Sequence, residues 1–512
     1  MNAAASSHTV LKNSLANLVT GSSTALVTVL VPPVLARTLP VGEFSTWVLV
    51  LQIAGYTALL NLGMQTAVSR YVAYCFARSD LRSASEFVSS AFCVLCVSAL
   101  VALAAILVGC SVLPQLFPQM PATFAGDARW ALALTGGALA LGLPSSAFNG
   151  VFLGIQRNEI VAAVTATTRL LLAGALIACA VLHTGIVLMS GVFAAVNLTS
   201  YFVLWGLHRR LHVVVVSLSL LGMRALREIW SYCGSAMIYS LSMLLVTGLD
   251  TAIVGRVEFP LVAQYSVCAG LIAFLAGVQN ALFAPLVQVG AVHSAKADTV
   301  ALRDLLIRAT RLSVVLLLAT SVPLLLFSGE ILSLLLGPIH SHKSTAIFQL
   351  LIVGHTVRLA ATPYAVLLFA TNQHKQVLTS PLLEGLTNVT VAIVAGMKYG
   401  AMGVACGVVT GAVVGQLFNY VYNLPRTHGP EFDRGELVYR SVFLPILCFL
   451  PSSLAVLLGS GMSLAKSIMI RCALILISLV LAWAFVIDTR EKESTLSFLV
   501  RYGRRGHACD PT

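Results

Sequence analysis

Four ionisable side chains lie inside strongly apolar segments, where a charge is costly. Arg169 stands nine residues into one such segment, and Arg358 stands thirteen residues into another. Glu384 lies eight residues into a third, and Asp250 lies near the end of a fourth. A charge at the centre of a bilayer costs about 2.5–3.5 kcal/mol even on lenient insertion scales, so it persists where it faces water or a partner. These residues are the first candidates for chemistry.

Neighbours at helical spacing extend two of these positions into polar faces. His355 precedes Arg358 by three residues, and Asn388 follows Glu384 by four. Residues three or four apart lie on the same face of a helix. We therefore expect a hydrophilic lumen between helices, in which Arg169 and Arg358 attract an anionic substrate and His355 and Asn388 line the same wall.

Two of these assignments have alternatives. The charges could form a structural ion pair, for example between Glu384 and Arg358 on neighbouring helices. Asp250 could end a helix structurally, or it could couple transport to an ion. A proton or ion gradient acting through Glu384 or Asp250 is one possible driving force, and consumption of the product on the far side is the other.

The segments that carry these residues predict an all-α integral membrane protein. The chain has 512 residues, of which 58% are hydrophobic and 10% charged, and its mean hydropathy is +0.92. About 20 apolar residues suffice to cross a bilayer as a helix. The loops are too short to hold a domain. About fourteen spans are expected, at 14–36, 44–66, 84–110, 129–153, 160–182, 185–207, 229–254, 261–289, 308–336, 345–370, 376–396, 400–422, 438–459 and 467–487.

Charge and repetition predict how these spans are organised. Lys and Arg are about three times as frequent in alternate loops, which predicts that both termini are cytoplasmic. Arg37 and Arg256 both end a span and are 219 positions apart, and Gln156 and Gln373 are 217 apart. A parallel repeat follows: an N-terminal six-helix lobe (1–207), a cytoplasmic linker (208–228), a second six-helix lobe (229–423), and two further helices with a cytoplasmic tail (424–512).

Several functional classes are disfavoured by the same composition. The net charge of +12 is spread over many short loops and forms no basic stripe, so no nucleic-acid partner is expected. Cys93 and Cys96 lie in an apolar segment and indicate core packing. No glycine is followed by lysine, so no P-loop is present. We expect no catalytic residue, no metal site and no cofactor, and therefore a protein that is not an enzyme.

Six short segments resemble one family when they are taken in their order and spacing. Together they are similar to the Wzx-type oligosaccharide flippases of the multidrug/oligosaccharidyl-lipid/polysaccharide (MOP) exporter superfamily, over about residues 11–423. The segments are VLARTLPVGEF (34–44), LGMQTAVSR (62–70), FLGIQR (152–157), LDTAIVG (249–255), ATNQHK (370–375) and YGAMGVA (399–405).

The resemblance implies a function that the residues alone do not. It implies translocation of a polyprenyl-pyrophosphate-linked oligosaccharide across the bacterial cytoplasmic (inner) membrane, for O-antigen, capsule or exopolysaccharide synthesis. Cationic lumen residues would bind the sugar-pyrophosphate; here these are Arg169 and Arg358, joined by Arg37 and Arg256. Membrane lipids, a polysaccharide polymerase and a co-polymerase are the expected partners.

Two related functions remain open from the sequence. One is an ion-coupled drug or cation antiporter of the same superfamily, which would favour a lumen rich in carboxylates. The other is a lipid II flippase. A membrane polymerase or glycosyltransferase is disfavoured, because no acidic catalytic pair is expected at a loop and no large outer loop is present.

Overall fold

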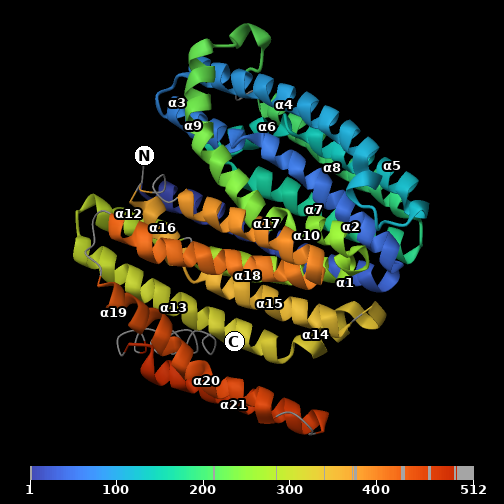
Figure 1. Ribbon diagram of the computed structural model, residues 1–512. Coiled ribbons are helices and arrows are strands. Elements are labelled where there is room, and N and C mark those ends of the chain that lie inside the picture. The colour runs from blue at the N-terminus through green and yellow to red at the C-terminus, as the bar shows by residue number, and fades with distance from the viewer. Residues whose placement is uncertain are drawn as a thin grey trace, which may run out of the picture. The chain divides into compact units, whose positions relative to one another are not determined.

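The computed structural model describes residues 3–211, 214–283, 285–339, 341–371, 373, 378–427, 433–458, 463–488 and 492. Within these ranges the chain forms helices joined by short turns, and no strand is present (Figure 1). The first half comprises α1 (Ala3–Thr38), α2 (Val41–Gly55), η1 (Tyr56–Asn61), α3 (Met64–Ala77), α4 (Leu81–Leu116), α5 (Ala122–Gly142), α6 (Ser145–Gly154), α7 (Asn158–Val181), α8 (Ile186–Leu211) and η2 (Leu218–Leu220). It is followed by α9 (Met223–Met243), η3 (Leu244–Gly248), α10 (Asp250–Val257), η4 (Phe259–Leu261), α11 (Val262–Phe283), α12 (Leu286–Ala295), α13 (Thr299–Leu326), α14 (Ser328–Leu336) and η5 (Gly337–Ile339). The remaining elements are α15 (His342–Leu359), α16 (Thr362–Ala370), α17 (Thr379–Tyr399), α18 (Ala401–Phe418), η7 (Asn419–Asn423), η8 (Leu424–Arg426), α19 (Arg434–Val438), η9 (Tyr439–Phe443), α20 (Leu444–Leu458) and α21 (Leu464–Phe485).

The predicted fold class is confirmed. Among the described residues, 12 helical stretches are long and apolar enough to cross a membrane, or 13 if α5 and α6 count as one span with a 40° bend. The bend falls at Pro144, which cannot continue the hydrogen-bond ladder of a helix. These stretches coincide with the predicted spans from 44–66 onward. The first predicted span lies in α1, whose side chains the structure describes from Thr20 on.

Contacts divide the chain into two compact units, and each is described by itself below. The first unit comprises residues 1–277, 332–351 and 378–415, and the second comprises 278–331, 352–377 and 416–512. Membrane orientation and the two six-helix lobes remain predictions. The expected cytoplasmic end at 488–512 lies largely outside the described residues, as does Lys375, and the side chains of 1–13 are not described.

Small residues allow close helix packing in the first unit. Gly150 and Gly154 of α6 lie against α3, where an added Cβ would come within 2.8 Å of the carbonyl oxygens of Gln65 and Ser69. Helices in membranes associate through such small-residue faces, because lipid offers no hydrophobic drive between them. A second example joins α17 to α18, where glycines recur every fourth position from Gly403 to Gly415.

The expected linker between the lobes is fixed to α4 by serine side chains. The Val215 N–H donates to Ser85 Oγ at 3.1 Å, and the Ser217 N–H donates to Ser89 Oγ at 3.1 Å. Ser89 Oγ donates in turn to the Val215 carbonyl at 3.3 Å. The segment before α9 therefore has its backbone groups satisfied by one face of a neighbouring helix.

The second unit is built around α13, which packs against α12, α16 and α20. Helices α20 and α21 lie side by side at one edge of this unit (Figure 1). Two ion pairs attach α21 and the residues after it. Arg471 Nη1 donates to Glu330 Oε1 at 2.6 Å, and Arg311 Nη2 donates to Asp488 Oδ2 at 2.7 Å. The hydrogen bond from Arg311 lowers the pKa of the Asp488 carboxyl.

Candidate functional site

One transmembrane helix of the first unit is interrupted inside its apolar part. Between α9 and α10 the chain forms a π-helical turn at Leu244–Gly248, just before Asp250. Such a turn disturbs the regular ladder of hydrogen bonds. In the bilayer, the carbonyl groups that it frees need partners from side chains. Gln52 Nε2 and Tyr56 Oη both donate to the Gly248 carbonyl, at 2.7 and 2.8 Å.

Asn388 of α17 reaches the same interruption from another side. Its Nδ2 lies 3.0 Å from the Val246 carbonyl, 3.3 Å from the Leu245 carbonyl and 3.0 Å from Asp250 Oδ1. Asn388 is fully buried, and Asp250 is 5% exposed. One amide therefore satisfies freed backbone groups and holds a carboxyl group in place at the end of the π-helical turn.

Glu384 stands one helical turn before Asn388 and is also buried. Glycines of α18 make room for it, because a Cβ at Gly415 would lie 2.8 Å from Glu384 Oε2 and one at Gly411 would lie 2.9 Å from its carbonyl oxygen. Ser380 Oγ donates to the Gly415 carbonyl at 3.1 Å. The polar stripe on α17 thus packs inside this unit, with its carboxyl group withdrawn from the surface.

A cleft of about 460 Å³ opens beside the Gly248 carbonyl. Residues of α2 and η1 form one wall, and residues of α9 and the π-helical turn form the other. The polar side chains in this lining are Gln52, Tyr56, Tyr239 and Ser240. Aromatic rings with hydroxyl groups, an amide and a serine form a surface that can bind a polyhydroxylated molecule.

A second helix break lies in the other unit, between α15 and α16. Pro363 stands in the first turn of α16 and has no N–H to donate to the Leu359 carbonyl. Gln279 Nε2 donates to that carbonyl at 3.2 Å and to Ser313 Oγ at 2.6 Å. Gln416 Nε2 donates to the Arg358 carbonyl at 3.0 Å. Two glutamines from neighbouring helices therefore satisfy the backbone at this break.

Arg358 lies in the last turn of α15, beside this break, and is half-buried. Its Nη1 is 3.3 Å from Nδ1 of His355. A guanidinium only donates, so Nδ1 accepts and the proton of the neutral ring lies on Nε2. His355 Nε2 is buried and has no hydrogen-bond partner among the described residues. A cation at the end of a half-helix also complements the helix dipole.

Arg169 stands at the middle of α7, about 16 Å from Asn158 at the start of the helix, at 1.5 Å per residue. Its side chain is exposed. Within the described part of the chain, no hydrogen bond or ion pair engages its guanidinium, which lies near Tyr201 of α8. The Tyr201 ring packs on Gly142, where any Cβ would collide with it.

Arg37 and Arg256 have defined partners at helix ends. Arg37 Nη2 donates to the Leu334 carbonyl at the end of α14. Arg256 Nη1 donates to the Leu116 carbonyl, the last residue of α4, at 3.2 Å. Both side chains are exposed. These two arginines contact helix termini of the first unit, whereas Arg169 does not.

Sequence reasoning missed two contributors to the site. Tyr56 was not singled out, although Gln52 and Tyr56 are four residues apart on one helix and so share a face. Gln416 was also missed, and its signal is an amide within an otherwise apolar span. Among the residues that the structure describes, no group of three or more His, Cys, Asp or Glu side chains could hold a metal ion.

Comparison with known proteins identifies the fold. No family model and no curated protein sequence matches this chain. The lipid II flippase MurJ, in an inward closed conformation, shares the fold with a TM-score of 0.67 at 13% identity, over 93% of this chain and 100% of that one. A MATE family multidrug resistance transporter of the MOP superfamily, in an inward-facing conformation, matches with a TM-score of 0.61 at 16% identity, over 84% of this chain and 96% of that one. A MOP superfamily transporter from Pyrococcus furiosus matches with a TM-score of 0.51 at 16% identity, over 82% of this chain and 95% of that one. The chain is therefore a multi-pass membrane protein with the fold of MOP superfamily transporters.

Proposed function

We propose that this protein is a Wzx-type flippase that moves a polyprenyl-pyrophosphate-linked oligosaccharide across the bacterial cytoplasmic membrane for surface polysaccharide synthesis. The observation that carries the proposal is the state of Arg169. An exposed guanidinium in the middle of a span, without an intramolecular partner in the described chain, is stable in a membrane when it faces water or an anion. A pyrophosphate offers oxygens that suit the bidentate fork of arginine.

The cleft beside Gly248 suits the sugar part of such a substrate. Sugar hydroxyl groups can hydrogen-bond to Gln52, Tyr56 and Ser240, and a sugar ring can stack on Tyr239, which is 42% exposed. The donor groups of Gln52 and Tyr56 already bind the Gly248 carbonyl, so these side chains present mainly acceptor oxygens to a ligand.

The second unit, taken by itself, has a cavity that suits a lipid chain. A cavity of about 440 Å³ lies among α13, α16, η7 and α20, and its lining is almost wholly apolar, as at Val314, Ala360 and Leu437. A prenyl chain is a hydrocarbon and is accommodated by such a lining without a desolvation cost. This cavity favours a lipid-linked substrate over a water-soluble one.

The pair formed by Asp250 and Asn388 is the candidate for ion coupling. A buried carboxyl group held by an amide can exchange a proton or bind a small cation, because either neutralises a charge that burial disfavours. Glu384 on the same helix supplies a second buried carboxyl group. These carboxyl groups are also what favours the second candidate function, an ion-coupled drug or cation antiporter.

The test is substitution of Arg169 in cells that depend on this protein for surface polysaccharide. Arg169→Ala should reduce polysaccharide sharply, with the protein still in the membrane and lipid-linked repeat units accumulating. Arg169→Lys should retain part of the activity, because a point charge still attracts phosphate although the fork is lost. Arg82→Ala is the matched control, since that arginine is exposed on the surface of α4, where it pairs with Glu86.

The alternatives give different results. Normal polysaccharide in Arg169→Ala would contradict the flippase proposal. If Glu384→Gln at the same time abolished resistance to a cationic drug, the antiporter would replace it. If cell-wall synthesis failed and surface polysaccharide did not, the substrate would be lipid II.

A further inference from the structure

The arginines that end α1 and α10 make equivalent contacts in a crossed arrangement. Arg37 donates to the carbonyl of Leu334, and Arg256 donates to the carbonyl of Leu116. The donors are 219 positions apart in the sequence, and the acceptors are 218 positions apart. Arg37 and Arg256 are thus equivalent positions of the repeat, and so are Leu116 and Leu334. Each arginine binds a leucine carbonyl of the other expected lobe.

Both acceptor groups are carbonyls that need partners. Leu116 is the last residue of α4, and Leu334 lies two residues before the end of α14. The last four carbonyls of a helix have no partner within the helix, and the C-terminus carries a partial negative charge. Gly337 adopts a φ of +57° after α14 and places no side chain beside Arg37, whose Nε would lie 3.5 Å from a Cβ there. The local backbone thus leaves room for the guanidinium.

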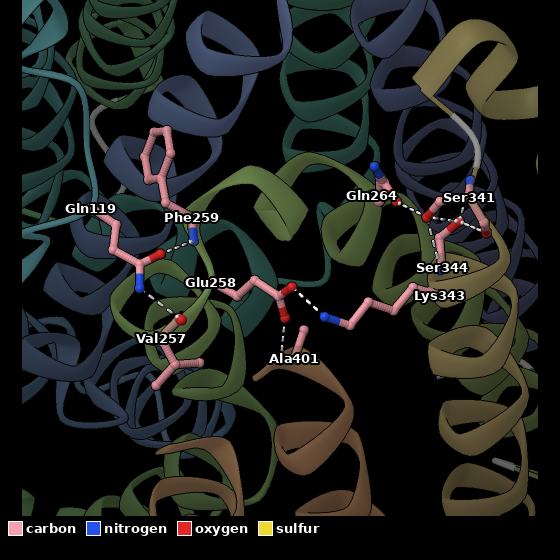
Figure 2. A network of polar contacts seen from close by, with 9 residues as sticks. All are labelled: Gln119, Val257, Glu258, Phe259, Gln264, Ser341, Lys343, Ser344 and Ala401. Atoms are coloured by element: carbon pink, nitrogen blue, oxygen red, sulfur yellow. Dashed lines mark hydrogen bonds and ion pairs between the residues drawn. The ribbon is translucent and has the colours of Figure 1, made fainter. Parts of the chain in front are cut away.

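Neighbouring contacts stabilise the turn at Val257–Phe259, directly after Arg256. Figure 2 shows that Gln119 donates to the Val257 carbonyl at 2.9 Å and accepts from the Phe259 N–H at 3.2 Å. It also shows Glu258 accepting from Lys343 Nζ and from the Ala401 N–H, the latter at 2.9 Å. Gln119 connects the two expected lobes, whereas Glu258 binds only within the second one.

We propose that Arg37 and Arg256 form a reciprocal latch that holds this end of the transporter closed, and that both contacts must be released when it opens. The proposal rests on the transport function argued above, because only a protein that opens alternately needs such a device. A contact inside one lobe does not resist separation of the two expected lobes. The contacts of Arg37 and Arg256 each join one expected lobe to the other, so they do resist it. Both arginine side chains are exposed, so water can replace each hydrogen bond when it breaks.

The test measures the distance between two spin labels and needs no substrate. The labels are placed at Leu107 on α4 and Leu334 on α14, in a protein whose native cysteines are replaced. Their side chains are 67% and 69% exposed, and the Leu334 carbonyl is unchanged by the label. The parent protein should give one short distance at this end.

Each single variant, Arg37→Ala or Arg256→Ala, should raise the ratio of long to short distances about tenfold, the effect expected from loss of one charged hydrogen bond. The two should act equally, and the double variant should open further. Arg→Lys should retain most of the short population. Arg129→Ala is the matched control, because that arginine is exposed on α5 and takes part in neither of the two contacts of the latch.

Unchanged distances in Arg37→Ala and Arg256→Ala would overturn the latch, even if both variants were less stable to heat. Should the arginine variants fail to fold, Gln119→Ala removes another contact between the lobes and must lengthen the distance if the lobes are held together at this end. The result is independent of Arg169. Normal polysaccharide in Arg169→Ala would contradict the proposed substrate. The latch would still be tested by the distances between the spin labels.

Discussion

Replacing Gln279 by Leu should destabilise the protein, because it leaves the buried Leu359 carbonyl without a hydrogen-bond donor. Gln279 is 3% exposed, and its amide serves the Leu359 carbonyl that Pro363 leaves without a donor. An unsatisfied buried carbonyl costs about 1–3 kcal/mol. Hydrogen bonds between membrane helices average about 0.6 kcal/mol and reach about 1.7. Because the Ser313 hydroxyl also loses its partner, we expect a loss of about 1–2 kcal/mol.

The cause can be separated from a general packing defect by a double-mutant cycle. Pro363→Ala restores an N–H that can donate to the Leu359 carbonyl. In that background, Gln279→Leu should cost about 1 kcal/mol less than in the parent protein. Asn280→Leu is the matched control, since the neighbouring amide is exposed and its loss leaves no buried group unsatisfied.

The measurement is reversible unfolding of the purified protein in mixed micelles, with the free energy of unfolding compared across the four members of the cycle. Equal costs of Gln279→Leu in the two backgrounds would refute the reasoning, because the cost would then not depend on the carbonyl that Pro363 frees. A neutral Gln279→Leu would refute it as well.

Two further predictions concern carboxyl groups. Asp250→Asn should preserve the hydrogen bond from Asn388 but abolish the dependence of transport on an imposed ion gradient in vesicles; an unchanged dependence would exclude Asp250 as the coupling group. Arg311 holds the pKa of Asp488 below its ordinary value of 3.8, so the pair stabilises the folded protein above pH 3.8 and loses its effect as the pH falls through the folded-state pKa. Asp488→Asn should therefore lower the melting temperature at pH 7, and the difference should shrink as the pH is lowered below 3.8; a constant difference would contradict the assignment.

The spans were predictable because apolar runs of about 20 residues are unambiguous in a sequence. The breaks inside them were less so. Pro363 marks the break after α15 in the sequence, but no proline marks the π-helical turn at Leu244–Gly248. That turn is stabilised by Gln52, Tyr56 and Asn388 from other helices, and such tertiary partners cannot be derived from local pattern.

The ionisable residues inside the spans could be located in the sequence, but the side chains and helices that surround them could not be derived from it. Glu384 and Asn388 were expected to line a lumen, and the structure places them against α18 in the first unit. The fourfold spacing of glycine from Gly403 to Gly415 indicates such close packing and is visible in the sequence. The role of these side chains in transport stays a prediction, as does that of Arg358.

The two kinds of polar contact in this protein differ in what can replace them. The amides of Gln279 and Asn388 are buried and bind carbonyl groups inside membrane spans, so releasing either leaves a buried group unsatisfied. Arg37 and Arg256 bind carbonyl groups at exposed helix ends, where water can take over each hydrogen bond at little cost. A transporter that changes shape repeatedly can therefore break the exposed arginine contacts at little cost in free energy. The buried amide contacts must stay intact during the change. We therefore expect each helix break to move together with the amide side chains that bind it, and the contacts of Arg37 and Arg256 to be the first that break.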